Sequence, residues 1–185
     1  MTGSVPVSVR WVGGDDGHLA LLDQTKLPGA IEWRDCRDVA AVIEALRAGM
    51  GPEAARAHLL AAAEEIAAAR PTAVNLRWAV ERVLGTLPDA TVPADAAALA
   101  AAALREAVAI HEEDRRLCTA IGRFGADILP EGDVLTHCNT GALATGGDGT
   151  ALAVITTAWA DGRRFRVWAD ETRPLFQGAR LTAWE

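Results

Sequence analysis

The stretch from Asp133 to Ala169 constrains the fold more than any other part of this sequence. A short apolar run leads from Val134 to Cys138, and a polar loop containing four glycines follows at once. Residues 150–160 have the pattern of a helix, and residues 165–169 have the pattern of a second strand. A strand, a helix and a strand in this order form a βαβ unit, whose two strands are parallel. We therefore expect residues 130–185 to form the first βαβ unit of a Rossmann-like domain.

Residues 1–129 have a different pattern, which predicts an N-terminal β-hairpin followed by helices. Two apolar stretches, at 7–12 and 18–23, flank the turn-rich sequence GGDDG, and a short third strand is expected at 30–33. Whether this hairpin only packs over a core or also faces a substrate is left open by the sequence. The overall fold class is α/β.

Apolar residues at helical spacing predict four helices between the hairpin and Pro130. The first begins near Asp38, the second at Pro52, and the third covers roughly 76–85. The fourth is long, from about 95 to 125, and its alanine-rich start favours a helix because alanine is the best helix former. Its apolar stripe is expected to face inward, at Leu104, Val108, Leu117, Ile121 and Phe124.

The predicted parallel sheet is too small to be complete. Parallel sheets are normally covered on both faces and contain several strands, whereas only two strands are predicted here. A last helix beginning near Gln177 has only about two turns before the sequence stops. We expect a truncated chain, or one that needs a partner to supply the remainder of the domain.

Composition excludes several classes of function. The formal net charge of −7 argues against a surface built for nucleic acid or for an anionic membrane. The N-terminus lacks the pattern of a signal peptide, and no run reaches the roughly 18 apolar residues of a membrane span. Three cysteines without CxxC spacing and four scattered histidines do not suggest a metal site or a disulfide framework. A cytoplasmic protein that binds a small molecule or another protein is favoured.

Cys138 is the candidate reactive group of this chain. It stands at the carboxyl end of a predicted parallel strand, which is where α/β sheets bind ligands. The glycine-rich loop from Asn139 frees backbone N–H groups that suit a phosphate. Glycine loops are also common connectors and free cysteines are often buried and inert, so this structural alternative stays open. His137 should point to the opposite face of the strand, which argues against a Cys/His pair.

Other polar residues are expected near the same edge. Arg173 and Gln177 follow the second strand and could form a polar pocket with Cys138, although Arg173 could equally pair with Glu171 or Asp170. Arg70 is a further candidate anion ligand, or else it caps the helix before it. Cys36 and Cys118 are expected to be structural.

Several ordered segments resemble methylthioribose-1-phosphate isomerases, the aldose–ketose isomerases of methionine salvage. The matching segments are LLDQTKLP (21–28), RPTAVNL (70–76), THCNTGALAT (136–145), GTALAVI (149–155) and ETRPLFQGARLTAWE (171–185). The resemblance covers most of this chain but only about the N-terminal half of the family's usual length. Ribose-1,5-bisphosphate isomerase and the regulatory subunits of initiation factor 2B share the fold.

The resemblance implies conversion of 5-methylthioribose 1-phosphate to 5-methylthioribulose 1-phosphate by a homodimer, with no cofactor and no metal. Cys138 would be the catalytic residue, and Arg70 and Gln177 would bind substrate. Asn139, Thr140, Gly141 and Arg173 are further candidate substrate-binding residues.

Two departures from the family pattern weaken the expectation of activity. A phosphate-binding motif R-G-A-P-A-I-G should follow the helix over 38–46, but here IEALRAG passes directly into MGPEAARAHLL. The family's catalytic aspartate and an Asn-Lys motif would lie beyond Glu185. The 185 residues alone are therefore expected to be a poor isomerase or none. The alternatives are a non-catalytic sugar-phosphate-binding or assembly module related to the initiation factor 2B regulatory subunits, or a product of gene decay without function.

Overall fold

A computed structural model describes residues 9–13, 18–36, 52–88 and 96–185. The chain forms two compact units, which we describe separately. Unit 1 groups Met1–Val12, Leu19–Asp35 and Glu112–Glu185, and unit 2 groups Gly13–His18 and Cys36–His111. These two units interleave along the sequence, so they do not correspond to one boundary between residues 129 and 130. The predicted domain boundary there stays a prediction.

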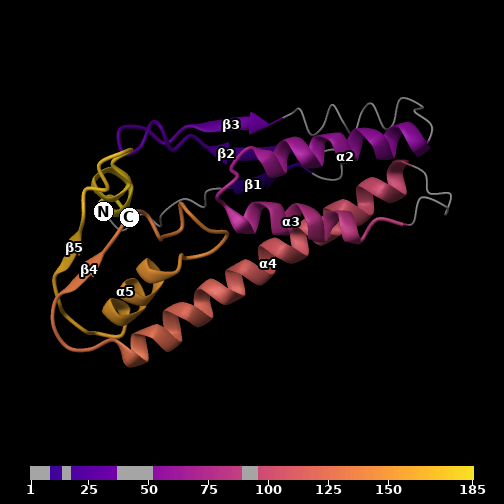
Figure 1. The fold of residues 1–185 in the computed structure, drawn as a ribbon. Helices are drawn as coiled ribbons and strands as arrows, with labels where there is room; N and C mark the ends of the chain where they lie inside the picture. Colours follow the sequence, from indigo (N-terminus) through magenta and orange to yellow (C-terminus); the bar gives the residue numbers. More distant parts are fainter. Residues whose placement is uncertain (1–8, 14–17, 37–51, 89–95) are drawn as a thin grey trace. The chain divides into compact units, whose positions relative to one another are not determined.

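Three N-terminal strands form one sheet in the order β1-β2-β3 (Figure 1). They are β1 (Val9–Val12), β2 (His18–Leu22) and β3 (Trp33–Cys36), so the two predicted hairpin strands are neighbours. The third strand begins at Trp33 rather than near Ala30. Residues before it form a tight turn instead, in which the Ala30 N–H donates to the Lys26 carbonyl oxygen at 3.0 Å.

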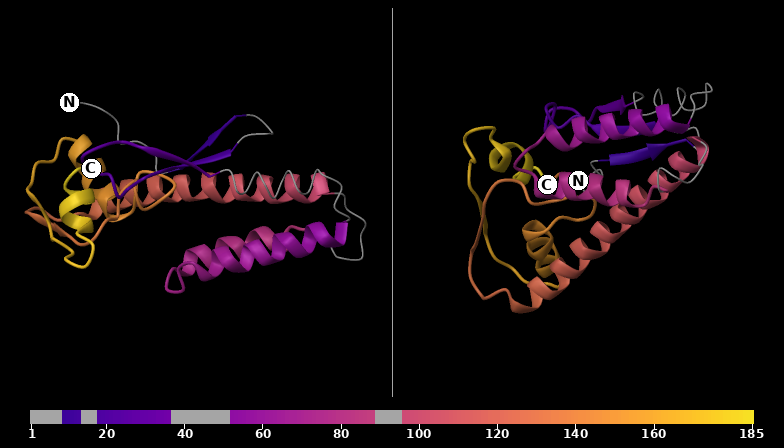
Figure 2. Two further views of the ribbon diagram at one scale, coloured as in Figure 1. Left: turned by 90° about the horizontal axis from the view of Figure 1, so that it is seen from above. Right: turned by 45° about the vertical axis from the view of Figure 1, so that its right-hand side comes forward.

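Unit 2 contains two helices that pack side by side, α2 (Pro52–Ala68) and α3 (Val74–Gly85), as Figure 2 shows. Both were predicted, and the predicted helix from Asp38 lies outside the described residues. An ion pair joins the helices, with Arg77 Nη2 3.2 Å from Glu64 Oε1. Leu87 and Leu99 form a small buried core beside them.

The long helix α4 (Ala96–Ile128) confirms the predicted element, but the predicted inward stripe is wrong. Leu104, Val108, Leu117, Ile121 and Phe124 are all exposed, and Phe124 is 63% exposed. In unit 1, α4 instead buries small residues at helical spacing: Cys118, Gly122 and Ala126. The spacing of large apolar residues predicts one face of the helix, but the face that is buried is the one on which the neighbouring helix packs. Among the described helices, none is long and apolar enough to cross a membrane.

Small residues of α4 allow close packing of α5 (Ala151–Ala160). A Cβ placed on Gly122 would lie 2.8 Å from Thr157 Oγ1 and 3.1 Å from the Ala153 carbonyl oxygen. One face of α5 is buried through Leu152, Ala153, Ile155 and Ala158. In Figure 1, α5 lies between the end of α4 and the second sheet.

That second sheet contains the predicted parallel pair, β4 (Val134–Thr136) and β5 (Val167–Ala169). Leu135 is in register with Trp168, and both side chains are exposed, at 75% and 55%. Among the described residues, this face of the pair is therefore left uncovered. A short π-helical turn, η1 (Gly178–Thr182), contacts β5.

We predict that Gly122→Leu lowers the free energy of unfolding by about 1–3 kcal/mol, because the new side chain must push α4 and α5 apart. Urea unfolding followed by circular dichroism measures the change. The matched control is Gly85→Leu at the end of α3, where an added Cβ meets nothing within 4 Å. Equal stability of the two variants would contradict the close packing of α4 on α5.

Candidate functional site

The ends of β4 and β5 bring two loops together in unit 1. Cys138 lies two residues beyond the end of β4, and Asp170 directly follows β5. Because the strands are parallel, their carboxyl ends meet at one edge of the sheet. The backbone is unusual there: Cys138, Thr172 and Phe176 have φ values of 61°, 50° and 55°. Such left-handed conformations are uncommon in residues other than glycine and need support from their surroundings.

The backbone of Cys138 receives this support on both sides. Its N–H donates to Thr172 Oγ1 at 3.0 Å and to Asp170 Oδ1 at 3.4 Å. Its carbonyl oxygen accepts a hydrogen bond from Thr182 Oγ1 at 2.6 Å. The amide and the carbonyl are therefore both engaged, while the side chain is only half-buried.

The Asp170 carboxylate is the centre of this network. The Thr172 hydroxyl donates to Oδ1 at 2.6 Å, and the His137 imidazole pairs with Oδ2. These hydrogen bonds, that of Thr172 first and that of His137 next, lower the pKa of Asp170 below its ordinary value of 3.8. Asp170 was considered in the sequence only as a partner for Arg173, and its role at Cys138 was missed.

The alternation of side chains along a strand, on which a His137–Cys138 pair was rejected, does not apply at these two residues. The strand was expected to reach Cys138, and it ends at Thr136 instead. The imidazole points to Asp170, and no hydrogen bond joins it to the thiol in this described part of the chain.

The three predicted loop residues adopt distinct positions. Asn139 Nδ2 donates to Thr182 Oγ1 at 3.2 Å and to Glu185 Oε2 at 2.5 Å. Thr140 Oγ1 accepts the N–H of Leu152 at 3.1 Å, at the start of α5. Gly141 is buried against the Glu185 carboxylate, where any Cβ would collide.

Sequence reasoning also missed Thr182 and Glu185 as site residues. Thr182 is buried, and Glu185 Oε1 accepts the N–H of Leu143 at 3.1 Å. The only available signal was their position in the ordered string ETRPLFQGARLTAWE, because nothing in their spacing identifies contacts with a loop 40 residues earlier.

Arg173 and Gln177 lie in the same C-terminal segment. Arg173 pairs with Glu171, as the alternative interpretation had it, with Nε 3.0 Å from Oε2, and its side chain is 83% exposed. Gln177 precedes η1, and its Oε1 is buried with no hydrogen-bond partner among the described residues. A buried carbonyl oxygen without a partner is costly, so Gln177 can accept a hydrogen bond from a ligand.

Arg70 belongs to unit 2, in the exposed turn after α2, where its carbonyl oxygen accepts the N–H of Ala73 at 2.9 Å. Its predicted contact with substrate stays a prediction. The predicted structural role of Cys118 agrees with its burial, since it is 1% exposed beneath the loop at Gly147. The side chain of Cys36 lies outside what the structure describes.

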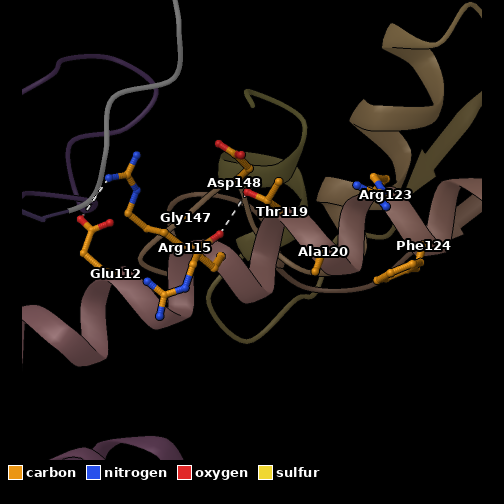
Figure 3. A pocket seen from close by; sticks show the side chains of 9 residues that line it. Glu112, Arg115, Thr119, Ala120, Arg123, Phe124, Gly147 and Asp148 are labelled. Carbon is orange, nitrogen blue, oxygen red and sulfur yellow. Dashed lines mark hydrogen bonds and ion pairs between the residues drawn. The ribbon is translucent and has the colours of Figure 1, made fainter.

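A hollow of about 430 Å³ lies beside the glycine-rich loop, and Cys138 does not line it. Figure 3 shows that α4 lines it, with the loop on its other side. Arginines, acidic residues and apolar groups share its surface, so it has no strong charge of one sign. The lining residues are Glu112, Arg115, Arg116, Thr119, Ala120, Arg123, Phe124, Gly147 and Asp148.

Metal-binding side chains do not gather in the described residues: no three of His, Cys, Asp and Glu there lie close enough to hold an ion. The side chains at this edge of the sheet include a half-buried thiol, two carboxylates, an imidazole and an amide.

Comparison with known proteins assigns the chain to a family. The model of the initiation factor 2 subunit family matches residues 30–185. The chain therefore belongs to this family, which agrees with the resemblance seen in the sequence. Within it, the relatives that the chain matches include proteins named as isomerases.

Methylthioribose-1-phosphate isomerase of Gemmatimonas aurantiaca is 46% identical to this chain over 209 residues, which is 98% of this chain and 60% of that protein. The crystal structure of 5-methylthioribose 1-phosphate isomerase from Pyrococcus horikoshii has a TM-score of 0.80 and 30% identity, covering 98% of this chain and 57% of that one. The initiation factor eIF-2B subunit delta from A. fulgidus has a TM-score of 0.74 and 36% identity, covering 97% and 58%.

The chain thus spans somewhat over half the length of the relatives it matches. The alignment with the Gemmatimonas protein runs over 209 positions although this chain has 185 residues, so that relative carries internal residues without a counterpart here. The prediction of a missing segment after the helix over 38–46 is compatible with this difference, and its location stays a prediction.

We predict that Cys138 is alkylated faster by iodoacetamide than Cys118, because its thiol is half-buried whereas that of Cys118 is buried. Peptide mass spectrometry of the native protein measures the rate at each thiol. We also expect Cys138 to react faster than Cys36. Equal rates at the three thiols would remove the case for a special environment.

We predict that Asp170→Asn destabilises the protein at neutral pH and that this effect fades in acid. A carboxyl with a lowered pKa in the folded state contributes stability above its unfolded value, near 3.8, and the contribution is lost as pH falls through the folded value. Urea unfolding of both proteins at pH 7 and below pH 3.8 measures the difference.

The matched control is Asp161→Asn, at an exposed carboxylate whose side chain makes no described hydrogen bond. A destabilisation by Asp170→Asn that is equally large at both pH values would mean that the charge of Asp170 does not support the network.

Proposed function

We propose that this chain carries the cysteine-bearing part of an isomerase site for 5-methylthioribose 1-phosphate. One observation carries the proposal: the backbone of Cys138 is fixed in a left-handed conformation at the ends of two parallel strands, which leaves its thiol half-exposed at the edge where such sheets bind ligands. The names of the isomerase relatives give the substrate class.

The reaction moves hydrogen within one molecule and needs no external oxidant. The bond between C1 and the ring oxygen breaks and the ring oxygen gains a proton, while C2 loses hydrogen, C1 gains it and the C2 hydroxyl becomes a carbonyl. Either a proton transfer or a hydride shift achieves this balance. In our proposal Cys138 acts as base or as a polarising neighbour, in a site shielded from water.

The remaining predicted residues bind the substrate in this proposal. Gln177 uses its buried, unpartnered Oε1 to accept a hydrogen bond from a sugar hydroxyl. Asn139, Thr140 and Gly141 place the loop, and Arg70 and Arg173 provide positive charge for the phosphate.

We further propose that the 185 residues by themselves bind this substrate but convert it poorly or not at all. The family resemblance assigns the acid/base aspartate to a segment that these 185 residues do not include, and none of the residues described at the Cys138 site is assigned that role here. Loss of one member of a catalytic set costs on the order of 10⁴-fold or more in rate.

Calorimetry with 5-methylthioribose 1-phosphate, followed by NMR detection of the ketose, tests both parts. We expect saturable binding that Gln177→Ala weakens roughly tenfold, because the amide loses its hydrogen bond to the ligand. Arg70→Ala should weaken binding as well. Its matched control is Arg77→Ala in the same unit, an exposed arginine that pairs with Glu64 and should leave affinity unchanged.

Rapid turnover that disappears in Cys138→Ala would confirm the isomerase and contradict the proposed inactivity. Absence of both binding and turnover would remove the proposal. Binding that no site variant weakens would place the ligand elsewhere on the chain.

A non-catalytic binding or assembly module is the second candidate function. The similarity to an initiation factor 2B subunit, with a TM-score of 0.74, supports it. Homodimer formation and a cytoplasmic location are expected in both cases. Assembly into a stable oligomer without affinity for the sugar phosphate would favour this second function.

A further inference from the structure

The end of the described chain crosses the loop that follows Cys138. Thr182 lies on η1 and Glu185 just beyond it, and together they contact Cys138, Asn139 and Leu143. Thr182 donates to the Cys138 carbonyl oxygen at 2.6 Å, and Glu185 Oε1 accepts the Leu143 N–H at 3.1 Å. The Asn139 amide lies between them and donates to Thr182 Oγ1 and to Glu185 Oε2.

These contacts form one connected chain of hydrogen bonds. A carboxylate only accepts hydrogen bonds, and each oxygen of Glu185 has one donor from the loop. The Thr182 hydroxyl donates its single hydrogen to the Cys138 carbonyl oxygen and accepts from the Asn139 amide, which also donates to Glu185. Gly141 packs directly against the carboxylate, so the loop and the Glu185 side chain fit without space for a Cβ.

We propose that Glu185 is a positioning residue for Cys138, acting through Asn139 and Thr182. This inference rests on the proposed function, because it assigns Glu185 to the presentation of the same thiol. The left-handed conformation of Cys138 is disfavoured for a residue with a Cβ and persists only while its surroundings impose it. When Glu185 no longer orients Asn139, the Thr182 hydroxyl turns away and Cys138 relaxes to a negative φ.

The test first changes Glu185 or Asn139 alone and then combines the two changes in one variant. Glu185→Gln keeps the size of the side chain but directs an amide at the Asn139 amide, and Asn139→Asp directs a second carboxylate at Glu185. In the double variant Asn139→Asp/Glu185→Gln these two side chains can form a hydrogen bond again, but the carboxylate at position 139 has no N–H to donate to Thr182 Oγ1. The double variant therefore separates the contact with Glu185 from the step through Thr182. Glu131→Gln, an exposed position before β4, is the matched control.

The readout is the rate of alkylation of Cys138 by iodoacetamide, with buried Cys118 as internal reference. We expect each single variant to speed alkylation of Cys138 roughly tenfold, as the loss of a charge-assisted hydrogen bond implies, while Cys118 stays slow. The double variant should stay as fast as the single variants, because the step from position 139 to Thr182 is still broken, and Glu131→Gln should leave the rate of the unmodified protein unchanged.

Unchanged Cys138 rates in the single variants would overturn the inference. A parallel increase at Cys118 would show general loosening of the unit, which also overturns it. Recovery in the double variant would overturn it too, because the step through Thr182 would then not matter. Alkylation is measured without substrate, so the role of Glu185 and the proposed function are tested independently of each other. Absence of sugar-phosphate binding with the expected alkylation pattern removes only the function, and binding with unaffected alkylation removes only the role of Glu185.

Discussion

The Asp170 carboxylate holds together the part of the molecule where chemistry is expected. It directly follows β5 and accepts hydrogen bonds from the Thr172 hydroxyl and the Cys138 N–H, while its second oxygen pairs with His137. One side chain therefore joins the loops that leave both parallel strands. Because each loop contains a left-handed residue, neither would keep its conformation without the other.

The elements of the fold could be predicted from local patterns, but the packing between them could not. Pro52 and the periodic leucines indicated α2, and the strand–loop–helix–strand order indicated the parallel pair. The inward face of α4 was assigned wrongly because periodicity favours large apolar residues, whereas α5 packs against Gly122. Glycine permits two helix backbones to approach closely, but a glycine does not count as an apolar residue when a hydrophobic stripe is read from the sequence.

In the candidate site, too, features of neighbouring residues could be predicted and contacts between distant residues could not. Cys138 and its loop could be predicted because a thiol and glycines after a strand are visible in adjacent letters. The partners of the loop lie more than 30 residues away, at Asp170, Thr182 and Glu185, and no local rule connects them. Asn139 and Gly141 were correctly singled out as loop residues, yet their hydrogen bonds and contacts depend on that distant segment.

Glycines at two positions explain how the distant segment can approach so closely. A Cβ on Gly178 would collide with the carbonyl oxygen of Asp170, and a Cβ on Gly141 would collide with the carboxylate of Glu185. The contact at Gly178 packs η1 against Asp170, which accepts the Cys138 N–H. The contact at Gly141 packs the loop against Glu185. A chain that kept Cys138 but gained a side chain at Gly178 would separate these segments. The arrangement of the site therefore depends on Gly141 and Gly178 as well as on Cys138.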